Sequence, residues 1–73
     1  MAIVSAIAVQ AALDATEKNM KILRVNPVSS TKDEFYVSGV TAPYAGKNRW
    51  VLTTCTDSAA TQATAITNAM AAD

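Results

Sequence analysis

The chain has 73 residues, a formal net charge of zero, a single Cys and no His. A chain of this length forms one domain, residues 1–73, which buries roughly 60% of the surface that the unfolded chain exposes and is therefore only marginally stable. One Cys excludes an internal disulfide, and the lack of His removes the common zinc ligand sets, so we expect association to supply stability.

The first predicted element is a helix from Ala2 to Asn19, because most residues in this stretch favour helices. Carboxylates precede lysines by four positions at 14/18 and 17/21, which stabilises a helix. The apolar side chains fall on two sides of this helix, one with Ile3, Val4 and Ile7, the other with Val9, Leu13 and Met20. A helix that is apolar on two sides needs two surfaces to bury it. If Val9 and Leu13 face the sheet, the other side is a protein interface formed by Ile3, Val4 and Ile7.

The same apolar segment has a competing interpretation as an edge strand, because residues 3–9 also alternate between large and small side chains. It does not resemble a signal peptide, because no basic residue precedes the run from Ala2 to Leu13. The run is also shorter than the ~20 apolar residues of a membrane span. We therefore expect a soluble protein with no membrane partner.

The middle of the chain predicts three strands. Period-two alternation begins near Asn19 and stops at Asn26-Pro27. The segment 34–40 is rich in aromatic and β-branched residues, and the segment 49–55 contains Trp, Val and Leu. Short loops between these strands predict an antiparallel meander.

A second helix is predicted after the strands, with Asp57 as its N-cap. Four apolar residues lie on one face of this helix at three- and four-residue spacing: Ala59, Ala63, Ile66 and Met70. The complete prediction is an α+β fold of order α-β-β-β-α, a three-stranded antiparallel meander with two helices on one face.

This element order and chain length resemble those of the double-stranded RNA-binding domain. That family places a Lys-rich motif at the start of its last helix, where it meets phosphates across the groove. The matching stretch here, residues 57–62, is acidic and contains no Lys. The resemblance therefore implies a topology and assigns no functional residues.

The basic residues all lie in the segment 18–49, where six of them accompany two acidic residues and give a formal charge of +4. If the helices cover one face of the sheet, the opposite face can carry cations and aromatic rings, which suit phosphates and bases. The candidate nucleic-acid residues are Arg24, Lys47, Arg49 and Trp50, with Tyr36 beside them. The alternative, which we favour, makes Trp50 and Phe35 core residues and the charges an ordinary solvated rim.

No catalytic pattern is present. The chain has no His to activate a nucleophile, and Cys55 stands among threonines near a strand end, which is typical of an unreactive thiol. Only two glycines occur and neither opens a helix, so no phosphate-binding loop is expected. The adjacent acids Asp33 and Glu34 make a poor Ca²⁺ site. We predict a protein that is not an enzyme and binds no cofactor or metal.

The function predicted from these features is a non-enzymatic protein–protein interaction or assembly role, with the protein itself or a larger assembly as partner. Ala and Thr make up about a third of the chain and supply few large side chains for a core. Such compositions are frequent among small bacteriophage structural or accessory proteins associated with the capsid or virion, so a virion and a host cytoplasm are the candidate locations. The alternative prediction is a small nucleic-acid-binding module that uses the basic and aromatic residues.

Overall fold

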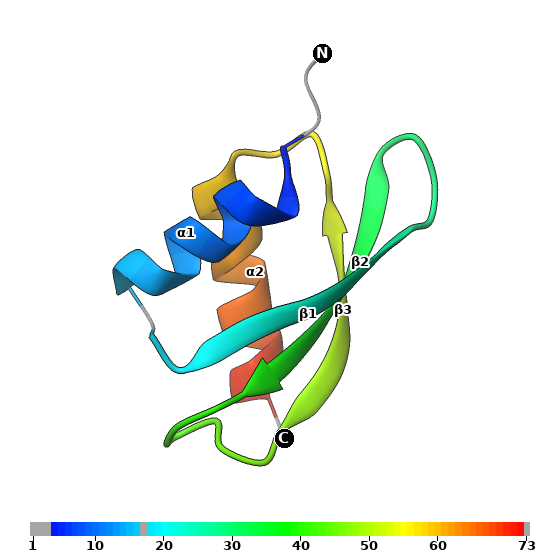
Figure 1. Cartoon of the computed structure of the whole chain (residues 1–73). Coiled ribbons are helices and arrows are strands. Elements are labelled where there is room, and N and C mark those ends of the chain that lie inside the picture. The colour runs from blue at the N-terminus through cyan, green and yellow to red at the C-terminus, as the bar shows by residue number, and fades with distance from the viewer. Residues whose placement is uncertain (1–3, 17, 73) are drawn as a thin grey trace.

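The computed structural model describes residues 4–16 and 18–72. Two helices flank three strands, in the order α1 (Ala6–Thr16), β1 (Met20–Pro27), β2 (Lys32–Gly39), β3 (Asn48–Thr54) and α2 (Ala59–Ala71) (Figure 1). The strands form one antiparallel sheet in the order β1-β2-β3. The predicted α+β class and the α-β-β-β-α order are therefore confirmed.

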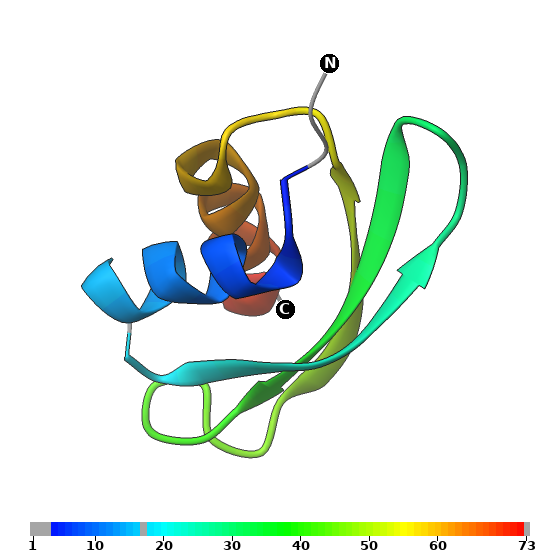
Figure 2. The ribbon, with the colours of Figure 1, turned by 45° about the horizontal axis from the view of Figure 1, so that its top comes forward.

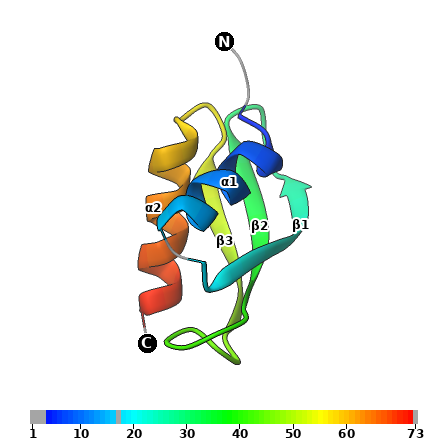
Figure 3. The ribbon, with the colours of Figure 1, turned by 60° about the vertical axis from the view of Figure 1, so that its left-hand side comes forward.

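Both helices pack against the same face of the sheet, as the two rotated views show (Figures 2 and 3). The core lies between these two layers. Its buried side chains come from every element and include Val9, Leu13, Met20, Phe35, Val37, Val51, Ile66 and Met70. Neither α1 nor α2 lies over the opposite face of the sheet.

Helix α1 begins at Ala6 and not at Ala2 as predicted. Ser5 precedes the helix, and its Oγ accepts a hydrogen bond from the amide of Ala8 at 3.2 Å, which satisfies one of the free amides of the first turn. Before the helix, the amide of Val4 donates to the carbonyl of Cys55 at 3.0 Å, just beyond the end of β3. The edge-strand alternative is wrong for residues 6–9, which are helical.

Strand β1 contains an irregularity that decides which side chains reach the open face. Ile22 pairs with Val37, whereas Arg24 pairs with Tyr36, so Leu23 is an extra residue in the ladder. Such a β-bulge shifts the alternation of side chains by one position. Arg24 therefore points to the same face as Tyr36, away from the helices.

Helix α2 is capped by Ser58 and not by Asp57 as predicted. The Ser58 Oγ accepts from the amide of Thr61 at 3.1 Å. The predicted apolar stripe packs inward, with Ala59 partly buried and the other three buried: Ala63, Ile66 and Met70. Gln62 is buried beside this stripe, which the apolar pattern alone did not indicate.

The two loops between strands differ in how closely they pack. The loop 40–47 returns against the end of β2: the amide of Gly39 donates to the carbonyl of Lys47 at 2.7 Å, and Tyr44 is buried. A Cβ on Gly39 would lie 1.7 Å from the carbonyl oxygen of Tyr44, so this position has room only for glycine. In the turn between β1 and β2, residues 28–31 are all exposed.

Candidate interaction surface

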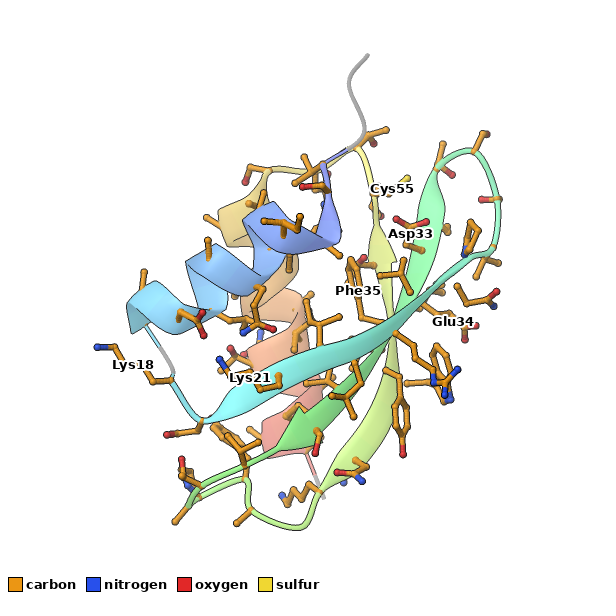
Figure 4. The ribbon with its side chains drawn as sticks, viewed as in Figure 1. Lys18, Lys21, Asp33, Glu34, Phe35 and Cys55 are labelled. Atoms are coloured by element: carbon orange, nitrogen blue, oxygen red, sulfur yellow. The ribbon has the colours of Figure 1, made fainter. Side chains whose placement is uncertain are left out.

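The candidate site is the outer face of the sheet, defined here as the face that the helices do not cover. Phe35 and Val37 of β2 are buried on the helix side, and alternate residues of a strand point to opposite faces. Phe35 lies on the helix side and Glu34 on the other (Figure 4). Pairing across the strands then assigns the outer face to Lys21, Arg24, Asn26, Lys32, Glu34, Tyr36, Ser38, Asn48, Trp50, Leu52 and Thr54.

An aromatic pair occupies the centre of the outer face. Tyr36 pairs with Trp50 across β2 and β3, and their ring centroids are 5.1 Å apart with the planes tilted by 44°. Contacts of this kind stabilise neighbouring strands beyond the area they bury. Trp50 is nevertheless 49% exposed, and Leu52, next on the same face, is 55% exposed. Of the two residues predicted as core anchors, Phe35 is in the core and Trp50 is not.

Polar side chains around this pair bind one another. Asn26 Nδ2 donates to Glu34 Oε1 at 3.0 Å, and Ser38 Oγ donates to Asn48 Oδ1 at 2.9 Å. Where β2 begins and β3 ends, Lys32 Nζ donates to Thr54 Oγ1 at 2.7 Å. These cross-strand hydrogen bonds hold the polar side chains around Tyr36 and Trp50 in place. They also give these polar groups partners within the protein.

The structure separates the four residues predicted to contact nucleic acid. Arg24 and Trp50 lie on the outer face, on either side of Tyr36. Lys47 and Arg49 lie on the helix side, where Lys47 Nζ donates to the carbonyl of Met70 at 3.2 Å and Arg49 donates to the carbonyl of Ala69 at 2.9 Å. The last carbonyls of a helix lack partners within the helix and attract cations. These two cations therefore serve the end of α2 and do not contribute to the outer face.

The three residues predicted to form an interface on the first helix do not form one surface among the described residues. Ile3 lies outside the described residues, and Val4 packs partly buried against the core. Ile7 is 83% exposed and, with Ile22 among others, lines a shallow groove of about 420 Å³ between α1 and β1. Of the three predicted residues, Ile7 is the one that the structure places on the surface.

Sequence reasoning missed the role of Gln10. Its side-chain amide donates to the carbonyl of Met20 at 3.1 Å and accepts from the amide of Ile22 at 2.7 Å. Gln10 therefore binds two backbone groups of β1 on the side away from β2. The signal in the sequence was a polar residue that interrupts the apolar run of the first helix.

Among the described residues, the ionisable and nucleophilic side chains form no catalytic or metal-binding cluster. Cys55 is buried, with its Sγ 3.6 Å from the carbonyl oxygen of Ser30. Asp14 pairs with Lys21 at 3.5 Å, and not with Lys18 as the helix spacing predicted. Within residues 4–16 and 18–72, no three potential metal ligands gather, and no helix is long and apolar enough to span a membrane.

Comparisons of this chain with protein-family models, with curated proteins and with solved structures found no match. The function is therefore inferred from the geometry of the outer face.

Proposed function

We propose that the protein is a non-enzymatic protein–protein interaction or assembly protein that binds further copies of itself through the outer face. The observation that carries this proposal is the position of Trp50 and Leu52, which are adjacent on an uncovered face and about half exposed. Single exposed apolar residues are ordinary, whereas a cluster of them marks a binding surface. Complete burial of a large apolar side chain contributes roughly 1.5–3 kcal/mol, and because Trp50 and Leu52 are each already half buried, covering both contributes about as much as burying one fully exposed side chain.

The surroundings of this cluster match the structure of protein interfaces, which have an apolar or aromatic centre and a polar rim. Trp and Tyr are enriched among the residues that contribute most to binding, and both are present here. The rim bonds between Asn26 and Glu34 and between Ser38 and Asn48 lower the cost of removing water from these groups, because each already has a partner.

The Ala- and Thr-rich composition extends the proposal to a small structural or accessory component of a bacteriophage virion. The extension rests on composition alone, and a gene located among capsid or tail genes would support it.

Sedimentation velocity between about 1 µM and 1 mM tests the proposal, because an assembly protein with an apolar face should gain mass with concentration. We expect Leu52→Asp to reduce that gain at least tenfold, since a carboxylate would then be buried in the contact. Ile7→Asp, the matched control on α1, should leave it unchanged. A monomer up to 1 mM would contradict the proposal, and loss of association in Ile7→Asp alone would move the interface to α1.

A second function is favoured by the row Arg24–Tyr36–Trp50, which combines a cation with two aromatic rings. Single-stranded nucleic acid binds such rows by stacking bases on the rings while cations contact the phosphates. Trp50 is the only Trp, so its fluorescence reports binding directly. A single-stranded oligonucleotide should quench it at about 20 mM salt, and the affinity should fall steeply by about 200 mM. No quenching at the lower salt concentration excludes this function.

A further inference from the structure

The edge of β3 that faces away from β2 carries backbone groups that are not paired with another strand of the described sheet. Along an antiparallel strand, residues that hydrogen-bond to the neighbouring strand alternate with residues whose backbone groups point away from it. The carbonyl of Lys47 accepts from Gly39, and the amide of Cys55 donates to Thr31, so both residues face β2. Trp50 and Leu52 stand three positions from these residues, and the β2–β3 register is regular between them. Their amides and carbonyls therefore point away from β2.

No segment that the structure describes outside the sheet forms a hydrogen bond with these backbone groups of Trp50 and Leu52. Unpaired edges of this kind accept another strand, and proteins usually protect them with charges, prolines, bulges or a covering element. β3 has no Pro, and its pairing with β2 shows no bulge. Its one charged side chain, Arg49, is already bound to the carbonyl of Ala69.

Charge is also depleted around this edge. In the segment 48–72, which contains both β3 and α2, Arg49 and Asp57 are the only charged residues. Helix α2 packs against β3 and has no charged residue, and its exposed side chains are small: Ala60, Thr61, Thr64, Ala65, Asn68 and Ala71. Depletion of charge distinguishes the centre of an interface from the remaining surface.

We infer that β3 pairs in antiparallel orientation with β3 of a second copy of this chain, joining two sheets into one of six strands. This inference rests on the proposed assembly function and specifies its geometry. A second copy fits because the edge is complementary to itself. With Val51 on the two-fold axis, Trp50 of each copy lies opposite Leu52 of the other, and Asn48 lies opposite Thr54.

This register forms a continuous apolar strip on the outer face, since Trp50 and Leu52 both point there. It places Arg49 opposite Thr53, so no like charges meet across the new pair. A specific dimer requires burial of about 600 Å² per copy at the lower end of the range. The described chain exposes 4216 Å², so the contact needs about a seventh of its surface.

Amide hydrogen exchange on ¹⁵N-labelled protein tests the pairing when combined with sedimentation. At about 1 mM, the amides of Trp50 and Leu52 should exchange at least tenfold more slowly than at about 10 µM, because pairing gives them acceptors. The amide of Val51 faces β2 and serves as the internal control, protected at both concentrations. A rise in mass without protection of Trp50 and Leu52 overturns the edge pairing and leaves the proposed function standing. No rise in mass overturns both.

Two substitutions at one position separate backbone pairing from side-chain contact. Leu52→Pro and Leu52→Thr both remove the leucine side chain, but only proline removes the outward amide. Because that amide has no role between β2 and β3, circular dichroism should show a folded protein in both variants. We expect Leu52→Pro to weaken the dimer at least tenfold more than Leu52→Thr. Equal weakening by the two variants would overturn the inference.

Discussion

The two edge strands of the sheet differ in how their outward-facing backbone groups are protected. On β1, the amide of Gln10 binds the outward carbonyl of Met20 and the outward amide of Ile22, Leu23 forms a bulge, and Pro27 ends the strand. On β3, none of these features occurs along Trp50 and Leu52. One helix side chain is thus enough to protect the backbone of an edge strand, and an edge strand without such a side chain can pair with a partner.

Each helix contributes one glutamine to an edge strand, and the two glutamines act at different places. Gln10 of α1 covers the backbone edge of β1 itself. Gln62 of α2 lies at the end of β3, where its Oε1 accepts from Thr53 at 2.9 Å and its Nε2 donates to the carbonyl of Asp57 at 2.9 Å and, more weakly, to that of Cys55 at 3.4 Å. Gln62 therefore stabilises the junction between β3 and α2 and leaves the β3 edge free.

The largest loss of folding stability is expected for Gln62→Leu. The change leaves the buried hydroxyl of Thr53 and the carbonyl of Asp57 without their partner, which should lower the free energy of unfolding by about 3 kcal/mol. Urea denaturation measures this loss. Thr64→Ala is the control on the same helix, because Thr64 is exposed, and it should change stability by less than about 0.5 kcal/mol. A Gln62 variant as stable as the control would show that the junction does not depend on this amide.

Gln10→Leu should have the next largest effect, because it removes the protection of the β1 edge. Loss of both bonds in a partly buried site should cost about 1–2 kcal/mol in urea denaturation. The amide of Ile22 should exchange faster, since its acceptor is gone, while the amide of Lys21 should keep its rate. Unchanged exchange at Ile22 would mean that Gln10 does not protect the edge.

A matched pair of leucines compares the edges directly. Leu23 on β1 and Leu52 on β3 are 58% and 55% exposed, so replacing either by Lys costs the monomer little. Leu52→Lys should weaken self-association at least tenfold, because two ammonium groups would be brought into the contact, whereas Leu23→Lys should leave it unchanged. Sedimentation of the two variants at equal concentrations decides this, and the opposite order would assign the contact to β1.

The smallest effect is expected for Lys21→Ala on the protected edge. Its ion pair with Asp14 is about half exposed and screened by solvent, so stability should fall by less than about 0.5 kcal/mol. The difference from wild type should shrink further when the salt concentration is raised to about 1 M. A loss above 1 kcal/mol that persists at high salt would show that this pair contributes to protecting β1 as much as Gln10 does.

The sequence predicted the element order because local signals mark each element. Alternating apolar residues, Asn26-Pro27 and the spacing of Ala63, Ile66 and Met70 each depend on neighbours within a few positions. Boundaries were less accurate: the Ser58 cap and the start of α1 at Ala6 depend on which of several adjacent polar residues meets the first free amides.

The candidate site was predicted only in part. Arg24 and Trp50 lie on the open face, as the nucleic-acid alternative expected, whereas the interpretation that we favoured placed Trp50 in the core. The bulge at Leu23 that turns Arg24 outward has no local signal. Lys47 and Arg49 were assigned to the same patch, yet the carbonyls at the end of α2 draw them to the helix side. That contact joins residues about twenty positions apart, so no short pattern in the sequence reports it.

The close approach of Gly39 to Tyr44 has a consequence for engineering this protein. Because the loop 40–47 is held against β2 at a position that admits no side chain, an inserted epitope or label there would displace Tyr44 from the core. The turn between β1 and β2 exposes residues 28–31, and an insertion between Ser29 and Ser30 leaves that packing untouched. Reporter groups and tethers therefore belong at the first hairpin.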